Sequence, residues 1–149
     1  MDVIKLYLDM DGVLCDFDKR YIELFDETPG SSRDKRNFSG NWIEFIEGEN
    51  FATLDWNPGG QELLAYVRTL PKDIEIEMLT SSGGMKYHNE VTIQKTQWLC
   101  ERGIEYKINT GHSSYTVLYT TEVMYGVRFE HPSCTIHYIF EINIHLIFF

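Results

Sequence analysis

The apolar residues of this chain follow strand-like and helical spacings in turn. Residues 3–8 form a short run rich in β-formers that stops at Asp9, and residues 74–79 form a second such run. Apolar side chains recur at helical steps over residues 17–25 and again over residues 89–102. This order of strands and helices predicts an α/β protein built on a parallel sheet.

Turn-forming residues separate these elements and mark an insertion. Pro29 opens a break after the first helix, and the following segment, residues 33–56, is charged yet aromatic, with no strand alternation. We expect this segment to be an inserted cap that is helical in part. Residues 57–60 have helix-entry character, and Pro71 closes the helix that follows. A third strand is expected over residues 104–108.

The bulk properties favour one folded domain. A chain of 149 residues suits a single core, which we expect over residues 1–149, with the cap over about 17–57 and a divergent tail over about 111–149. Hydrophobic residues make up 43% and charged residues 24%, unlike disordered chains. The sequence shows neither a signal-peptide pattern nor a run of membrane-helix length, so we expect a soluble, cytoplasmic protein that does not bind a membrane.

The net charge and the cysteines limit which classes of ligand and which compartment are expected. A net charge of −10 repels a phosphate backbone, so a nucleic acid polymer is not expected as the ligand. A small phosphorylated ligand remains compatible with this charge, because a bound divalent cation inverts the local field. Three scattered cysteines indicate neither a zinc site nor a disulfide framework and fit a reducing compartment: Cys15, Cys100 and Cys134. The oligomeric state stays open, with a homodimer among the alternatives.

Candidate catalytic groups follow both predicted strands. Asp9 and Asp11 come directly after the first strand, and Thr80 follows the second. Ligands of parallel α/β sheets bind outside the carboxyl ends of the strands, where these side chains are expected to meet. Of two carboxylates one residue apart, one can attack or ligate a metal while the other handles a proton. Gly12 lets the backbone approach a bound phosphate.

Each of these signals has a simpler structural explanation. Asp and Gly favour turns, so the segment from Asp9 to Gly12 alone is equally typical of a solvated turn. Thr80 and Ser81 could merely end a strand, and periodicity alone favours a surface position for Lys95.

The combination of segments resembles a known family. Residues 9–17, DMDGVLCDF, resemble the first motif of the haloacid dehalogenase (HAD) superfamily in the form found in 5′(3′)-deoxyribonucleotidases. Residues 78–81, MLTS, look like its second motif, and residues 94–99, QKTQWL, like its third. Residues 51–60 are similar to its cap-to-core return. The resemblance covers about the first 110 residues and implies a HAD-like (Rossmannoid) parallel sheet flanked by helices, with a small, mainly helical cap inserted after the first strand.

The resemblance also implies a chemistry. The implied activity is that of a magnesium-dependent phosphomonoesterase, a 5′-nucleotidase that dephosphorylates (deoxy)nucleoside monophosphates through an aspartyl-phosphate. Asp9 would be the nucleophile and a Mg²⁺ ligand, and Asp11 the acid/base, whose carbonyl also ligates the metal. Thr80 would bind the phosphoryl oxygens, and Lys95 would neutralise the charge of Asp9 and phosphate. The residues expected to contact substrate are Ser81 and the aromatic side chains of Phe17, Trp42 and Phe51, with Phe45 beside them; packing within the cap is the alternative for each aromatic side chain.

The tail departs from the family pattern. A fourth motif should supply a further acidic metal ligand, yet all nine aspartates lie at or before Asp73. Glu122 is the nearest substitute, and Glu130 is a second candidate. A shifted reading frame or a replaced C-terminus past Thr110 is a hypothesis that the coding DNA can test. Two functional alternatives therefore stay open: a phosphatase for another small phosphate ester, and a catalytically impaired phosphate- or metal-binding remnant.

The final residues of the tail carry a separate signal. Residues 139–149 alternate partly like a strand and are strongly apolar. We expect them either to pair into the sheet or to promote aggregation.

Overall fold

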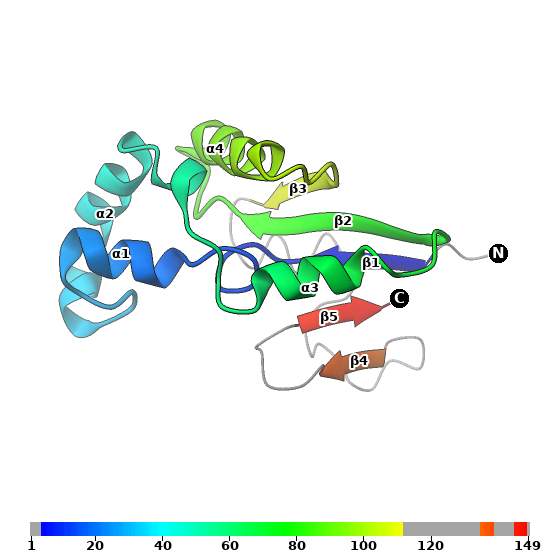
Figure 1. The fold of residues 1–149 in the computed structure, drawn as a ribbon. Coiled ribbons are helices and arrows are strands. Elements are labelled where there is room, and N and C mark those ends of the chain that lie inside the picture. The colour runs from blue at the N-terminus through cyan, green and yellow to red at the C-terminus, as the bar shows by residue number, and fades with distance from the viewer. Residues whose placement is uncertain (1–3, 112–134, 139–144, 149) are drawn as a thin grey trace.

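A five-stranded sheet organises the chain. The computed structural model describes residues 4–111, 135–138 and 145–148, and places the strands in the order β3-β2-β1-β5-β4 (Figure 1). β1, β2 and β3 are parallel, whereas β5 pairs antiparallel with β1 and β4 antiparallel with β5. The strands are β1 (Ile4–Leu8), β2 (Ile74–Ser81), β3 (Lys107–Gly111), β4 (Thr135–Tyr138) and β5 (His145–Phe148). The predicted α/β class is confirmed, and β1, β2 and β3 form the predicted parallel arrangement, whereas β4 and β5 make the whole sheet mixed.

One face of the parallel strands is apolar. Leu8 of β1 lies opposite Met78 of β2, which lies opposite Ile108 of β3. Leu8 and Met78 are fully buried, and they belong to the same apolar cluster as Leu63 of α3 (Gly60–Val67) and Trp98 of α4 (His88–Glu101). The two crossover helices therefore cover the face that presents these apolar side chains.

The neighbouring positions of the same strands are polar. Glu77 of β2 lies opposite Tyr7 of β1 and Lys107 of β3, and its side chain is buried. Burial by itself favours the neutral acid, but hydrogen bonds from Lys5, Asn109 and Lys107 outweigh it and lower the pKa of Glu77 to about 2. The alternation of charged with apolar residues in these strands thus reflects two chemically different faces.

The segment predicted to be a cap consists of helical segments between β1 and α3, and it is called the cap below. α1 (Phe17–Phe25), α2 (Ser32–Glu47) and the 3₁₀ helix η1 (Asn50–Thr53) follow one another. Figure 1 shows α1 and α2 beyond the carboxyl ends of the parallel strands. Asp16 caps α1 by accepting from the Lys19 N–H, and Ser31 caps α2 by accepting from the Asp34 N–H. The helical character expected for residues 33–56 is confirmed.

The third strand begins later than the sequence predicts. The sequence predicts a strand over residues 104–108, whereas β3 covers Lys107–Gly111. Gly103 adopts a φ of +63°, which turns the chain out of α4, and Ile104 then enters the core with 3% of its surface exposed. Ile104 packs into the core directly after this turn, so its β-branched side chain does not mark the start of a strand.

The last described segment joins the sheet. Leu6 of β1 lies opposite Phe148 and Tyr7 opposite Ile147, so β5 occupies the edge of β1. Sheet pairing, one of the two outcomes expected for the C-terminal segment, is therefore observed for these residues. Within the described part of the chain, no helix is long and apolar enough to span a membrane.

The close approach of α3 to the loop after β1 gives a test of the packing. A Cβ atom at Gly60 would lie 2.7 Å from the carbonyl oxygen of Leu14 and 3.1 Å from that of Val13. We predict that Gly60→Ala lowers the free energy of unfolding by about 1–3 kcal/mol, because backbone atoms must shift. Gly40→Ala is the matched control: its Cβ meets nothing within 4 Å in α2. It should stabilise by about 0.5–1 kcal/mol. Urea unfolding measures both values, and equal effects would contradict this packing.

Candidate active site

A tight loop after β1 holds the two aspartates. The carbonyl of Met10 accepts hydrogen bonds from the N–H groups of Val13, Leu14 and Cys15 at 3.1, 2.9 and 3.0 Å. Gly12 adopts a φ of +74°, a conformation that glycine enters without strain. Asn57 clamps the loop from the cap-to-core return, since its Nδ2 donates to the Gly12 carbonyl at 3.0 Å. The loop is therefore a braced structure rather than a freely solvated turn.

Lys95 connects this loop with the end of β2. Its Nζ donates to Asp11 Oδ2 at 2.5 Å, to Thr80 Oγ1 at 2.7 Å and to the Ser81 carbonyl at 2.9 Å. Only 1% of the lysine is exposed. The surface position that periodicity favoured for Lys95 is wrong, because α4 turns this side chain under the ends of β1 and β2. Asp11, Thr80 and Lys95 thus meet where the sequence placed a site.

Asp9 has an unusual protonation equilibrium. Burial raises the pKa of Asp9 to about 7, and the charge of Asp11 contributes in the same direction. The Met10 N–H, which donates to Oδ1 at 2.7 Å, and the charge of Lys95 oppose this shift. Among the described residues, Lys95 makes its hydrogen bonds to Asp11, Thr80 and Ser81, so its influence on Asp9 is electrostatic.

Asp11 differs from Asp9 in its partners. Its side chain is 31% exposed and forms an ion pair with Lys95. Its other oxygen, Oδ1, lies 3.6 Å from the Sγ of Cys15, whose thiol donates to it. Burial and the charge of Asp11 raise the pKa of Cys15, so the sulfur stays a neutral thiol. No local sequence pattern predicts this contact of Cys15, which arises from the fold of the loop.

The end of β2 is held to the end of β3. Thr80 is buried and contacts Lys95, whereas the Ser81 hydroxyl accepts from the Gly83 N–H at 3.1 Å. Ser82, which sequence reasoning did not select, donates from its N–H to the carbonyl of Gly111 at 2.8 Å. These contacts position Thr80 and Ser81 at the carboxyl edge of the sheet beside Asp11.

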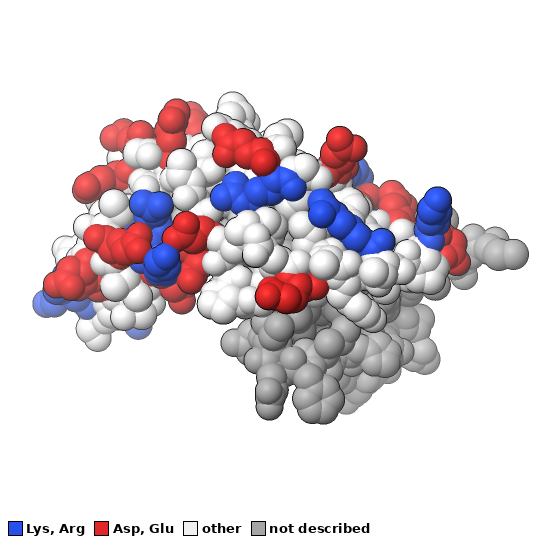
Figure 2. All heavy atoms as spheres, in the orientation of Figure 1, with Lys and Arg blue, Asp and Glu red and all other residues white. Residues whose placement is uncertain are grey.

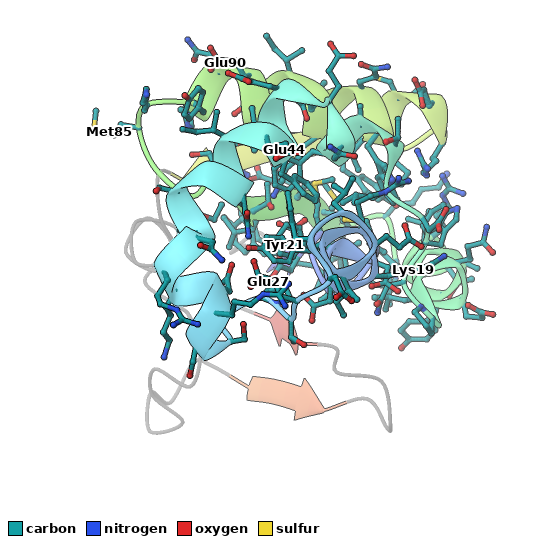
Figure 3. All side chains as sticks on the ribbon, turned by 90° about the vertical axis from the view of Figure 1, so that its left-hand side faces the viewer. Lys19, Tyr21, Glu27, Glu44, Met85 and Glu90 are labelled. Atoms are coloured by element: carbon teal, nitrogen blue, oxygen red, sulfur yellow. The ribbon has the colours of Figure 1, made fainter. Side chains whose placement is uncertain are left out.

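The aromatic residues of the cap form one cluster. The rings of Phe17 and Phe51 stack with centroids 5.9 Å apart, and Trp42 meets Phe51 edge-on at 5.6 Å. Phe45 packs against Phe51 at 4.9 Å, so packing within the cap, the alternative to substrate contact, is observed. Figure 3 shows Tyr21, another member, pointing inward between α1 and α2. The cluster reaches the predicted catalytic groups, because the Phe51 ring centroid lies 4.8 Å from the Nζ of Lys95.

The donor set suits Mg²⁺ only in part. Within the described ranges, no group of three His, Cys, Asp or Glu side chains is placed to hold a metal ion. Asp9 offers one carboxylate, to which the family resemblance adds the main-chain carbonyl of Asp11, and Mg²⁺ commonly uses one or two carboxylates with waters and substrate phosphate. Glu122 and Glu130, the candidates for a further ligand, lie outside the described residues, as does Cys134.

Comparison with known proteins adds no relative. The chain matches no protein-family model, no curated protein and no solved structure. We therefore infer the function from the geometry of Asp9, Asp11, Thr80 and Lys95.

The raised pKa of Asp9 predicts a pH-dependent stability. A carboxyl group that prefers its neutral form in the folded state loses stability between pH 3.8, its ordinary pKa, and about pH 7, and the loss is complete above pH 7. Asn at position 9 cannot ionise. Without divalent metal, Asp9→Asn should therefore stabilise the protein at pH 8 by roughly 2–4 kcal/mol and have little effect at pH 4. Urea unfolding at both pH values measures this, and a stabilisation that is equal at the two would contradict the assignment.

Proposed function

We propose that the protein is a magnesium-dependent phosphomonoesterase of the HAD type, acting on (deoxy)nucleoside monophosphates. One observation carries the proposal: a buried lysine joins Asp11, Thr80 and the Ser81 carbonyl beside a second carboxylate, Asp9. Phosphoryl transfer requires a nucleophile, a proton donor and cationic or hydrogen-bonding groups around the phosphoryl oxygens. These four side chains supply all three kinds of group.

The first step would transfer the phosphoryl group to Asp9. A carboxylate oxygen of Asp9 attacks phosphorus, the bond from phosphorus to the ester oxygen breaks, and Asp11 protonates the departing alcohol. The Thr80 hydroxyl donates a hydrogen bond to a phosphoryl oxygen. When Mg²⁺ is bound by the Asp9 carboxylate and the Asp11 carbonyl, it supplies positive charge that offsets the charge of the phosphoryl oxygens and favours ionised Asp9.

The second step would hydrolyse the aspartyl-phosphate. Asp11, now a carboxylate, takes a proton from water while the water oxygen attacks phosphorus, which releases phosphate and restores Asp9. The ion pair of Asp11 with Lys95 corresponds to this carboxylate form.

The surroundings favour an aromatic, singly phosphorylated substrate. The aromatic cluster of the cap lies beside Lys95 through Phe51, and such rings can stack on a nucleobase. Figure 2 shows Asp and Glu side chains interspersed with Lys and Arg over α1 and α2, beyond the carboxyl ends of the strands. Because this surface is mixed and the net charge of the chain is −10, a polyanionic nucleic acid is disfavoured.

A catalytically impaired remnant is the second candidate. It is supported by the described residues, whose acidic, His and Cys side chains form no group of three around Asp9. Such a protein would bind Mg²⁺ or phosphate without turnover. Clean magnesium-dependent turnover would exclude this candidate.

Substitution of the nucleophile tests the proposed reaction. We predict magnesium-dependent release of phosphate from deoxynucleoside monophosphates, and a loss of at least about a thousandfold in kcat for Asp9→Asn or Lys95→Met. Asp73→Asn is the matched control, because Asp73 is an exposed aspartate in the turn before β2. Phosphate release with and without Mg²⁺ gives the rates. Unchanged turnover of the Asp9→Asn protein would remove Asp9 as the nucleophile.

The aromatic cluster gives a separate test of substrate class. Trp42 is half-buried and stacks with the exposed Phe38 at a centroid distance of 5.7 Å. Base stacking on an aromatic side chain contributes about 1–3 kcal/mol, so Trp42→Leu should lower kcat/KM for nucleoside monophosphates by about tenfold or more. Glycerol phosphate, which lacks a base, should be affected less than twofold by the same change. Equal losses for both substrates would instead favour a phosphatase for another small ester.

A further inference from the structure

α4 carries a row of side chains that hold the return segment of the cap. Gln94, Trp98 and Arg102 are spaced four residues apart and lie along one side of the helix and its C-terminal cap. Trp98 Nε1 donates to the Leu54 carbonyl at 2.7 Å, and Arg102 Nη2 donates to the same carbonyl at 2.9 Å. The guanidinium also lies 4.1 Å from the ring centroid of Trp98. The end of the cap is thereby fixed to the helix that carries Lys95.

Both the nitrogen and the oxygen of the Gln94 side-chain amide form hydrogen bonds with backbone atoms of this segment. Its Nε2 donates to the Ile46 carbonyl at 2.8 Å, and its Oε1 accepts from the Phe51 N–H at 3.2 Å. Ile46 lies in the last turn of α2 and Phe51 in η1, so one side chain spans the turn through which the cap returns. Gln94 is 7% exposed, so both contacts are made away from water and are costly to lose.

Phe51 transmits this placement to the catalytic lysine. Its side chain is 1% exposed, and the ring centroid lies 4.8 Å from Lys95 Nζ. An aromatic face attracts an ammonium group, and the attraction is stronger when both are removed from water. Lys95 follows Gln94 directly, so successive residues of α4 contact the cap backbone and the catalytic loop.

We propose that Gln94 is a positioning residue, which fixes the ring of Phe51 so that the Lys95 ammonium stays directed at Asp11 and Thr80. Its catalytic consequence rests on the proposed function. The positioning of the Lys95 ammonium by Gln94 and Phe51 does not depend on that function. Gln94 does not reach the reacting atoms itself, and its effect is exerted through Phe51 and Lys95.

The kinetic test compares two glutamines of the same helix. Gln94→Leu keeps the approximate size of the side chain and removes both hydrogen bonds, whereas Gln97→Leu removes only a contact with Glu101 at 2.8 Å on the exposed side. We expect Gln94→Leu to lower kcat for a deoxynucleoside monophosphate by about ten- to a hundredfold, because a small displacement of a catalytic group is costly. KM should change less than kcat, and Gln97→Leu should stay within twofold of the parent protein.

A second readout needs no turnover. A buried, hydrogen-bonded ammonium exchanges slowly enough to give a ¹H–¹⁵N signal, and Lys95→Met identifies it by its loss. This signal should be present in the parent protein and in Gln97→Leu, and broadened or shifted in Gln94→Leu. Phe51→Leu should alter it similarly while keeping both amide hydrogen bonds, so it tests the claim even if Gln94→Leu fails to fold.

The outcomes separate the inference from the proposed function. An ammonium signal that is unchanged in both Gln94→Leu and Phe51→Leu would overturn the positioning role, as would absence of the signal in the parent protein. A parent protein that releases no phosphate, yet shows the expected changes in the signal, would contradict the proposed function and leave the positioning role standing. Loss of activity in Lys95→Met with full kcat in Gln94→Leu would contradict only the role of Gln94.

Discussion

The buried ammonium group of Lys95 is the constraint on which the site depends. A charge removed from water is costly unless it is paired and hydrogen-bonded, and Lys95 is 1% exposed. Its three acceptors come from the loop after β1 and the end of β2, while the lysine itself comes from α4. Satisfying one ammonium therefore fixes three elements that are far apart in the sequence. Asp11 and Thr80 are positioned by the same requirement.

This arrangement makes the two aspartates chemically different. Asp11 is paired with the Lys95 ammonium, whereas burial and the nearby charge of Asp11 raise the pKa of Asp9 to about 7. Near neutral pH Asp9 therefore accepts a proton readily, because a second carboxylate charge in this buried position beside Asp11 is unfavourable. A divalent cation at Asp9 would offset that charge and favour the carboxylate. The proposed chemistry assigns the two aspartates different roles for this reason.

The sequence predicts the framework better than the contacts within the site. Short apolar runs that end at Asp9 and Thr80 were sufficient to place β1 and β2, because local alternation and turn residues determine those elements. The start of β3 was missed, because Ile104 serves the core and not the sheet. Periodicity also misjudged Lys95, since a buried lysine on a helix is favoured only by acceptors brought from distant segments.

Local sequence patterns do not predict several other tertiary contacts of the site. Gln94 and Cys15 gain their contacts only when the cap and the loop after β1 fold against the core. Their residue types carry no distinctive spacing. The aromatic character of the cap is evident from the sequence, but the mutual packing of its rings and the approach of Phe51 to Lys95 depend on the tertiary structure.

Trapping the covalent intermediate would show directly whether Asp9 is the nucleophile. The protein, mixed with Mg²⁺ and a deoxynucleoside monophosphate, is quenched in acid during turnover, digested and analysed by mass spectrometry. The account predicts one added phosphoryl group on the peptide that contains Asp9, formed and lost at rates compatible with turnover. Steady release of phosphate with no phosphoryl group on that peptide, under conditions that preserve acyl phosphates, would contradict it.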